Sequence, residues 1–416
     1  MNPYQQLDAW IDAHFDEEVR FLQALVRVPT DTPPGNNAPH ADRAAELLKG
    51  FGLQAEKHPV PEDEVKAYGL ESITNLIVRH PFGASGGGKT IALNAHGDVV
   101  PPGDGWTHDP YGGEIVDGKL YGRASAVSKS DFASYTFALR ALAGLKSSVK
   151  LAGTVELHFT YDEEFGGELG PAWLLRHKLT KPDYLIAAGF SYQVVTAHNG
   201  CLQMEVTVHG KMAHAAIPDT GIDALQAATA ILNSLYDQNR IYKGISSRVA
   251  GITHPYLNVG RIEGGTNTNV VPGKVVFKLD RRMIPEENPT EVEASVRRVI
   301  AEAAAKVPGI RVEIKRLLMA ESLKPLPGNA PLVKALQTHA QAVIGEPVPT
   351  SGTPLYTDVR LYGAYGIPAA IYGAGPRTVL ESNAKRADEH LVLEDLRHAT
   401  KVVARTLFDL LRADTQ

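Results

Sequence analysis

The chain has almost no cysteine and only a small excess of negative charge. Cys201 is the single cysteine in 416 residues, which excludes an internal disulfide bond and a metal cluster bound by several thiolates. The formal net charge of −5 gives no support to a basic surface that binds nucleic acid. We therefore expect no nucleic-acid partner and a fold stabilised by an apolar core in a reducing compartment.

The sequence also lacks a long uninterrupted apolar run. Its first segment, "MNPYQQLDAWIDAHFDEEVRFLQALV", carries charges throughout, unlike the continuous apolar stretch of a signal peptide. No segment reaches the roughly 20 apolar residues that a membrane-spanning helix needs. The sequence thus predicts no membrane partner and a cytoplasmic location.

Apolar residues recur with helical and strand spacing in alternation over the first half of the chain. Helices are predicted over 4–27, 41–53 and 131–145, and strands over 74–80, 90–98 and 153–164. Strands that alternate with helices indicate an α/β fold with a mixed, mostly parallel sheet flanked by helices. Polar residues just after such strands lie where open sheets carry their active sites.

The pattern changes between residues 199 and 315. Strands with alternating apolar and polar residues are predicted there over 201–210, 256–265, 274–283 and 310–318, and amphipathic helices over 221–238 and 290–306. From about residue 330 the α/β pattern returns. We therefore predict a main α/β domain formed by 1–198 and 316–416, interrupted by an inserted α+β domain over 199–315.

Two polar motifs follow predicted strands. The stretch "HGD" places His96 and Asp98 after one strand, and a carboxylate beside a histidine can fix the imidazole for metal binding or catalysis. The stretch "DEE" places Glu163 and Glu164 at the end of another strand. Each motif alone also fits a solvated turn or a helix cap, so neither defines a function by itself.

Five motifs occur in one order along the chain: "HGDVVPPGDGW", "DGKLYGR", "DEEFGGELG", "GKMAHAAIPDTGIDAL" and "GGTNTNVVPGK". This order closely resembles the family of co-catalytic zinc amidohydrolases and peptidases that includes acetylornithine deacetylase, succinyl-diaminopimelate desuccinylase and glutamate carboxypeptidase. The resemblance covers nearly the whole chain. It implies a catalytic α/β domain with an inserted dimerisation or lid domain, and hydrolysis of an amide or peptide bond.

The resemblance assigns roles to four residues of the main domain. His96 matches a histidine that binds a metal, and Asp98 matches the acid that orients this histidine. Glu163 matches the general base that activates the attacking water, and Glu164 matches a carboxylate that binds a metal. These four residues are therefore the candidates for a catalytic centre at the strand ends.

The resemblance also assigns substrate contacts. His214, in "KMAHAAIP", matches a lid histidine that polarises the substrate carbonyl, typically in the site of the partner subunit. Asn269 and Arg282 match lid residues that hold the substrate, and the arginine implies a small molecule with a carboxylate. Gly373 and Gly375, in "YGAGP", match a loop that lines the substrate pocket. The resemblance thus implies a homodimer.

Three positions depart from the family pattern. In the loop "YGRASAVSKSD", Val127 stands where an aspartate would bridge two metals. Counting back from "AHNG" puts Ala188 at the next acidic ligand, and Lys385 in "NAKRADEH" stands at the last histidine ligand. Each metal would keep one protein ligand, His96 or Glu164, whereas a catalytic zinc usually has three.

Three hypotheses follow. The preferred one is a hydrolase that uses no metal cofactor, with Glu163 as the base and Lys385 and His214 as electrostatic helpers. A fixed ammonium group can replace part of the charge that a metal supplies.

The second hypothesis is a metal-dependent hydrolase with a rearranged site, in which Asp131, Asp162 or His390 helps to hold zinc. The third is a non-catalytic protein that keeps the binding pocket and the dimer. Retention of the base Glu163 favours an enzyme, because a binding protein does not need it.

Overall fold

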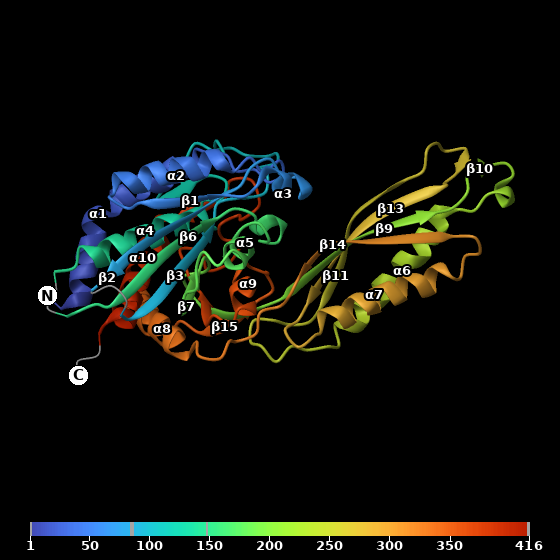
Figure 1. Cartoon of the computed structure of the whole chain (residues 1–416). Helices are drawn as coiled ribbons and strands as arrows, with labels where there is room; N and C mark the ends of the chain where they lie inside the picture. Colours follow the sequence, from blue (N-terminus) through green and yellow to red (C-terminus); the bar gives the residue numbers. More distant parts are fainter. Residues whose placement is uncertain (1, 84–86, 147–148, 414–416) are drawn as a thin grey trace. The chain divides into compact units, whose positions relative to one another are not determined.

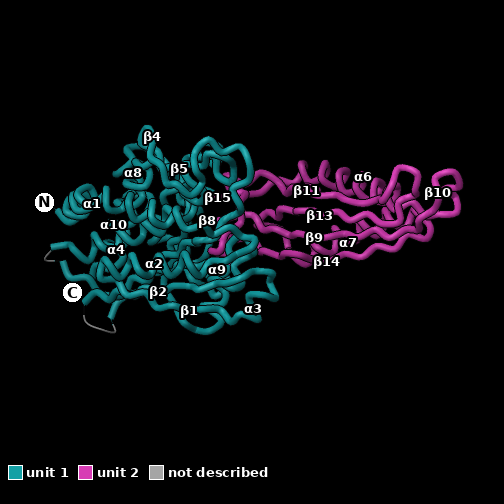
Figure 2. The backbone as a smooth tube through the Cα atoms, turned by 90° about the horizontal axis from the view of Figure 1, so that it is seen from above, with its two compact units in different colours: residues 1–196, 325–351, 361–416 teal, residues 197–324, 352–360 magenta. Residues whose placement is uncertain are grey.

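The computed structural model describes residues 2–83, 87–146 and 149–413, and it divides into two compact units (Figure 2). The first unit comprises Met1–Thr196, Pro325–Ser351 and Leu361–Gln416, and the second comprises Ala197–Lys324 and Gly352–Arg360. Each unit has an apolar core of its own.

An eight-stranded sheet with the order β1-β2-β6-β3-β7-β16-β8-β15 organises the first unit (Figure 1). Its strands are β1 (Ala55–Pro59), β2 (Thr74–Phe82), β3 (Lys89–His96), β6 (Gly153–Thr160), β7 (Tyr184–Ala187), β8 (Val194–His198), β15 (Thr350–Thr353) and β16 (Ala369–Ile371). The central strands β6, β3, β7 and β16 are parallel, whereas β1 and β2 form an antiparallel edge. The predicted α/β class with a mostly parallel sheet is therefore confirmed.

Helices flank this sheet, and α1, α4 and α10 pack against one another in the core. The helices are α1 (Pro3–Val26), α2 (Ala38–Gly50), α3 (Glu62–Ala67), α4 (Lys129–Ala143), η1 (Glu163–Phe165), α5 (Pro171–Arg176), α8 (Ala330–Ile344), α9 (Val359–Ala364) and α10 (Leu393–Leu411). The sequence "NPYQQ" starts α1 with a reciprocal cap. The Asn2 side chain accepts the N–H of Gln5, and the Gln5 side chain accepts the N–H of Asn2.

A small three-stranded sheet, β17-β5-β4, joins two loops that are distant in sequence. Its strands are β4 (Glu114–Val116), β5 (Lys119–Tyr121) and β17 (His390–Val392). β17 pairs antiparallel with β5, so that His390 lies opposite Tyr121. The loop that follows β5 is therefore held next to the loop that precedes β17.

One buried carboxyl joins α1 to α10. Glu18 is fully buried, and its Oε1 accepts the hydroxyl of Thr400 at 2.6 Å. Burial raises the pKa of Glu18 to about 8, although the hydrogen bond from Thr400 and the charges of Arg397 and Arg140 lower it. Glu18 therefore takes up a proton when the chain folds between about pH 4.5 and 8.

The variant Glu18→Gln should be more stable than the wild type in alkaline solution. The free energy of unfolding of the wild type should fall as the pH rises through this window, and the variant should lack this fall. At pH 9 we expect the variant to be more stable by on the order of 5 kcal/mol, and the two proteins to be nearly equal below about pH 4.5. Urea unfolding at both pH values measures the difference, with the exposed Asp16→Asn as the control; equal stabilities at pH 9 would contradict the account.

The second unit is an α+β sandwich. Its four-stranded sheet has the order β11-β13-β9-β14, and alternate residues of β9 and β13 are buried under α6 and α7 (Figure 1). Its elements are β9 (Gly200–His209), β10 (Ala213–His214), η2 (Pro218–Thr220), α6 (Ala224–Tyr242), β11 (Tyr256–Gly264), β12 (Val270–Val271), β13 (Lys274–Met283), α7 (Pro289–Ala304) and β14 (Arg311–Ala320). Across the described ranges of the whole chain, every helix is too short or too polar to cross a membrane.

Candidate active site

The two polar motifs lie at the ends of neighbouring parallel strands. β3 ends at His96, which pairs with Thr160 at the end of β6. Asp98 follows β3, and Glu163 and Glu164 follow β6 in the short helix η1. Because parallel strands end at the same edge of a sheet, all four candidate side chains are brought to one region of the first unit.

His96 is held in place by Asp98. Its Nδ1 lies 2.9 Å from the backbone oxygen of Asp98 and 3.4 Å from Oδ1 of the buried carboxylate, whose Oδ2 accepts the N–H of Glu164 at 3.0 Å. Burial alone would lower the pKa of His96, but the hydrogen bond to Asp98 and the charge of Glu163 raise it to about 10. The neighbouring carboxylates therefore favour the protonated form of His96.

Glu163 faces His96, with Oε2 of the carboxylate 4.0 Å from Nε2 of the imidazole. Burial raises the pKa of Glu163 to about 7; the charge of Glu164 adds to this effect, and the charges of His96 and Lys385 oppose it. A carboxyl group that exchanges its proton near neutral pH is suited to general acid–base catalysis.

Lys385 forms an ion pair with Glu164. The Lys385 Nζ lies 2.7 Å from Oε2 of Glu164, whose side chain is only 7% exposed. Burial alone would lower the pKa of Lys385, but the charges of Glu164 and Glu163 raise it. The Lys385 side chain is 59% exposed, so this ammonium group is both fixed by an ion pair and open to solvent.

The other two altered positions offer no atom that could bind a metal. Ala188 donates its backbone N–H to Asn94 at 2.9 Å, next to the end of β3. Val127 lies against the glycine loop, because a Cβ added to Gly375 would be 3.3 Å from its Cγ2. Both side chains are hydrocarbon and therefore cannot bind a metal.

A buried acid supports the loop that contains the two candidate glycines. Asp131 is fully buried, and its Oδ1 accepts the N–H of Ala374 at 2.7 Å. A Cβ added to Gly373 would lie 2.2 Å from the same oxygen, and one added to Gly375 would lie 2.5 Å from the carbonyl oxygen of Gly189. Both positions therefore require glycine.

The residues considered as substitute metal ligands have other contacts. Asp131 supports the glycine loop, Oδ2 of Asp162 accepts the N–H of Leu169 at 2.6 Å, and Nδ1 of His390 lies 3.0 Å from the carbonyl oxygen of Asp388. Within residues 2–83, 87–146 and 149–413, no three histidine, cysteine, aspartate or glutamate side chains are grouped so that they could hold a metal ion.

Two of the candidate lid residues are neighbours in the second unit. β10 pairs with β12, which places His214 opposite Val270. The backbone oxygen of Asn269 accepts the N–H of Ala215 at 3.0 Å. His214 and Asn269 are both exposed, so they are available to a molecule outside this unit.

Arg282 lies at the other end of the same sheet. β13 begins at Lys274, beside the β10–β12 pair, and reaches Arg282 about 27 Å further along the strand. The Arg282 Nε donates to Oδ1 of Asp280 at 2.7 Å, and the guanidinium lies 5.6 Å from the ring centre of Tyr356. One chain therefore brings His214 and Asn269 together but separates them from Arg282.

The sequence reasoning missed a buried ion pair beside the site. Nη1 of Arg123 lies 2.6 Å from Oε2 of Glu389, and the two side chains are 1% and 2% exposed. It also gave no role to Lys129, whose buried Nζ donates to the carbonyl oxygen of Val28 and whose pKa is lowered by burial to about 7. Arg123 and Glu389 belong to the quoted stretches "YGR" and "DEH", but 266 positions separate them, so only the fold shows that they meet.

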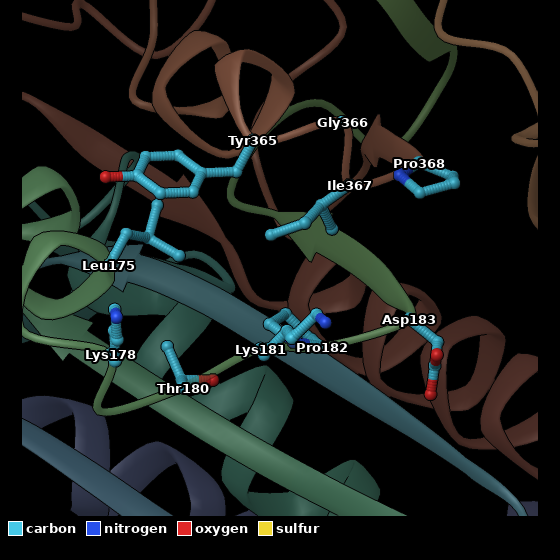
Figure 3. A pocket seen from close by; sticks show the side chains of 10 residues that line it. All are labelled: Leu175, Lys178, Thr180, Lys181, Pro182, Asp183, Tyr365, Gly366, Ile367 and Pro368. Atoms are coloured by element: carbon cyan, nitrogen blue, oxygen red, sulfur yellow. The ribbon is translucent and has the colours of Figure 1, made fainter.

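A cavity of about 580 Å³ lies elsewhere in the first unit (Figure 3). Leu175, Tyr365 and Ile367 contribute apolar surface to it, and its lining includes Asp183 and Pro368, which precede β7 and β16. The candidate site lies beyond the opposite ends of these strands, so this cavity is not part of it.

The family match and the fold place this chain among the hydrolases that act on amide and peptide bonds. Residues 92–409 match the family model described as peptidase family M20/M25/M40, and the chain belongs to this family, whose members act on amide and peptide bonds. The predicted family is therefore confirmed.

Known relatives agree with this assignment. An uncharacterized metallohydrolase of Methanocaldococcus jannaschii is 24% identical over 92% of this chain and 96% of its own length. Human carnosine dipeptidase 1 has the same fold, with a TM-score of 0.77 and 17% identity over 99% of this chain and 100% of the other. A dinuclear metal-binding M20 peptidase of Bacillus subtilis has a TM-score of 0.64 and 19% identity over 96% and 99% of the two chains.

Proposed function

We propose that this protein hydrolyses the amide bond of a small, carboxylate-bearing molecule without the two-metal centre of its family. Glu163 serves as the base, and Lys385 and His214 stabilise negative charge on the substrate. The observation that carries the proposal is the ammonium group of Lys385, which lies 2.7 Å from Glu164 at a position where the family resemblance expects a metal ligand.

Three residues of the site support catalysis without a bound metal. Val127 and Ala188 have no atoms that bind a metal, and the Lys385 ammonium group offers no lone pair while it is paired with Glu164. A dication would be repelled by this ammonium group, which lies 2.7 Å from Glu164.

The same groups can support hydrolysis in two steps. In the first step Glu163 takes a proton from water while the water oxygen bonds to the carbonyl carbon of the substrate. The carbonyl π electrons move to oxygen, where the positive charge of Lys385 stabilises the oxyanion. In the second step the C–N bond breaks and Glu163 returns the proton to the leaving nitrogen, so that the products are a carboxylic acid and an amine.

Arg282 supports a substrate that carries a carboxylate, because a guanidinium group binds carboxylates through two parallel hydrogen bonds. The test is a panel of dipeptides and N-acyl amino acids, each compared with its C-terminally amidated form. We expect kcat/KM to be at least roughly tenfold higher for the free carboxylates, and Arg282→Gln to remove this preference. Equal rates for both forms would overturn the substrate assignment, and no hydrolysis of any member would favour a non-catalytic binding protein.

A metal-dependent hydrolase is the second candidate. It is favoured by the metal-binding descriptions of the relatives and by the presence of His96, Asp98 and Glu164 in this chain. The two candidates differ in one property, which is whether chelation removes activity.

The separation of His214 and Arg282 within the second unit supports a homodimer. His214 lies in β10 beside the start of β13, and Arg282 lies about 27 Å further along β13, which is further than one small molecule can span. If both contact the same substrate, one of them must come from a second copy of the chain. We therefore propose a cytoplasmic homodimer in which His214 completes the site of the partner subunit.

Mixing two inactive variants should restore activity if His214 acts in the partner's site. Glu163→Gln removes the base and His214→Ala removes the polarising group, but a mixed dimer contains one site with both residues intact. After unfolding and refolding together, an equal mixture should regain about a quarter of the wild-type rate, whereas each variant refolded alone should stay inactive. No gain on mixing, or a monomer by light scattering at micromolar concentration, would contradict this arrangement.

A further inference from the structure

The carboxylate of Glu389 joins two loops of the first unit that are distant in sequence. It accepts Nη1 of Arg123 at 2.6 Å, the backbone N–H of Ala126 at 3.3 Å and the backbone N–H of Lys385 at 3.3 Å. The side chain is only 2% exposed, so water does not compete for these bonds. One buried acid is therefore bonded at the same time to the loop before β17 and to the loop after β5.

The loop before β17 is irregular and depends on such bonds. Asn383, Lys385 and Asp388 all adopt left-handed backbone conformations, with φ values of 53°, 62° and 55°. Such conformations are unfavourable for residues other than glycine and persist only where the surroundings hold them. The backbone bond from Lys385 to Glu389 is thus one of the contacts that maintain this loop.

The loop after β5 is also hydrogen-bonded to Glu389. The backbone oxygen of Glu389 accepts the N–H of Gly122 at 2.9 Å, and its carboxylate reaches Ala126, which directly precedes Val127. Nη2 of Arg123 donates to the carbonyl oxygen of Pro102 at 2.7 Å, in the segment that follows Asp98. Three of the loops that contribute to the candidate site therefore meet at the Arg123–Glu389 pair.

We propose that Glu389 is a positioning residue that ties Lys385 to the loop after β5 and so keeps the ammonium group of Lys385 against Glu164. This inference rests on the proposed function, in which that ammonium group stabilises the oxyanion. The lysine side chain is long, flexible and 59% exposed, so its ion pair with Glu164 does not by itself fix its position. Its backbone must therefore be fixed, and Glu389 supplies the bond that connects this backbone to the site.

The test compares Glu389→Gln with Glu389→Asp and with the exposed control Glu381→Gln. Glutamine has one acceptor oxygen and one NH2 group, so it cannot accept from all three donors, and aspartate keeps the negative charge opposite Arg123 but is too short to reach both backbone groups. Glu381 belongs to the same loop, and its carboxylate accepts the backbone N–H of the nearby Arg377 at 3.2 Å. Hydrogen exchange followed by mass spectrometry would measure peptides covering 122–128, 383–390 and the core of α10.

In both Glu389 variants we expect amide exchange to rise at least about tenfold in 122–128 and 383–390 together, with no change in the core of α10. On a substrate that the wild type hydrolyses, kcat should fall at least about tenfold while KM changes by less than about threefold. Glu381→Gln should change neither property.

Faster exchange in 383–390 alone, or in both loops with an unchanged kcat, would overturn the proposal. If Glu389→Gln fails to fold, the amide exchange and the kcat of Glu389→Asp test the proposal in its place. If the wild type hydrolyses nothing, the proposed function fails, but the exchange pattern still shows whether Glu389 ties the two loops together.

Discussion

Lys385→Met should reduce turnover by about 10²–10³-fold while leaving the fold and the dimer intact. This is the effect of removing one group that stabilises an oxyanion, and methionine keeps the length and the apolar stem of lysine without its charge. The neighbouring Glu163 remains in place, so the loss would come from the missing cation and not from loss of the base. Steady-state kinetics on the best substrate of the panel measures this change.

The effect on stability should be much smaller than the effect on rate. Breaking a fully buried ion pair costs about 3–5 kcal/mol. The pair of Lys385 with Glu164 is not of this kind, because the Lys385 side chain is 59% exposed although Glu164 is 7% exposed. We therefore expect Lys385→Ala to lower the free energy of unfolding by about 1 kcal/mol.

Two further variants make the rate measurement decisive. Lys385→Arg keeps a cation and should retain part of the activity, whereas Arg386→Met removes the adjacent exposed cation and should change the rate less than about twofold. Full activity of Lys385→Met, or an equal loss in Arg386→Met, would show that Lys385 has no special role.

Glu163→Gln should have the second large effect, a loss of about 10²–10⁴-fold in kcat. Glutamine has nearly the same shape as glutamate but cannot accept the proton of the attacking water. The substitution also removes one of two adjacent carboxylates and with it their mutual repulsion. The folded variant should therefore be at least as stable as the wild type.

The matched control for this variant is Glu168→Gln. Glu168 lies in the same "DEEFGGELG" stretch, is 41% exposed and pairs with Arg176 at the surface. We expect this control to keep wild-type activity. A Glu163→Gln variant that retains more than about a tenth of the wild-type rate would mean that another group is the base.

Much of the fold could be predicted because long elements leave a strong periodic pattern. The helix predicted over 4–27 is α1 (Pro3–Val26), and the strand predicted over 274–283 is β13 (Lys274–Met283). The short strands β4, β5 and β17 were not predicted, because three residues are too few to show a period. They matter nonetheless, since the β5–β17 pairing holds two site loops together.

The candidate site could be predicted where its residues follow strands. His96 and Glu163 come together because β3 and β6 are parallel neighbours, and the contact of Lys385 with Glu164 follows from the positions of the family's metal ligands. The roles of these residues in catalysis stay predictions. The Arg123–Glu389 pair could not be predicted, because opposite charges at distant positions can pair in many ways and only the folded chain selects one.

The metal content of the active protein tests the central claim most directly. The protein would be purified without added metal, measured by elemental analysis, treated with a strong chelator and assayed for hydrolysis before and after treatment. The account predicts less than about one-tenth of a zinc, manganese or cobalt ion per chain and an unchanged rate after chelation. One or two metal ions per chain that are removed together with the activity, and zinc that restores both, would contradict it.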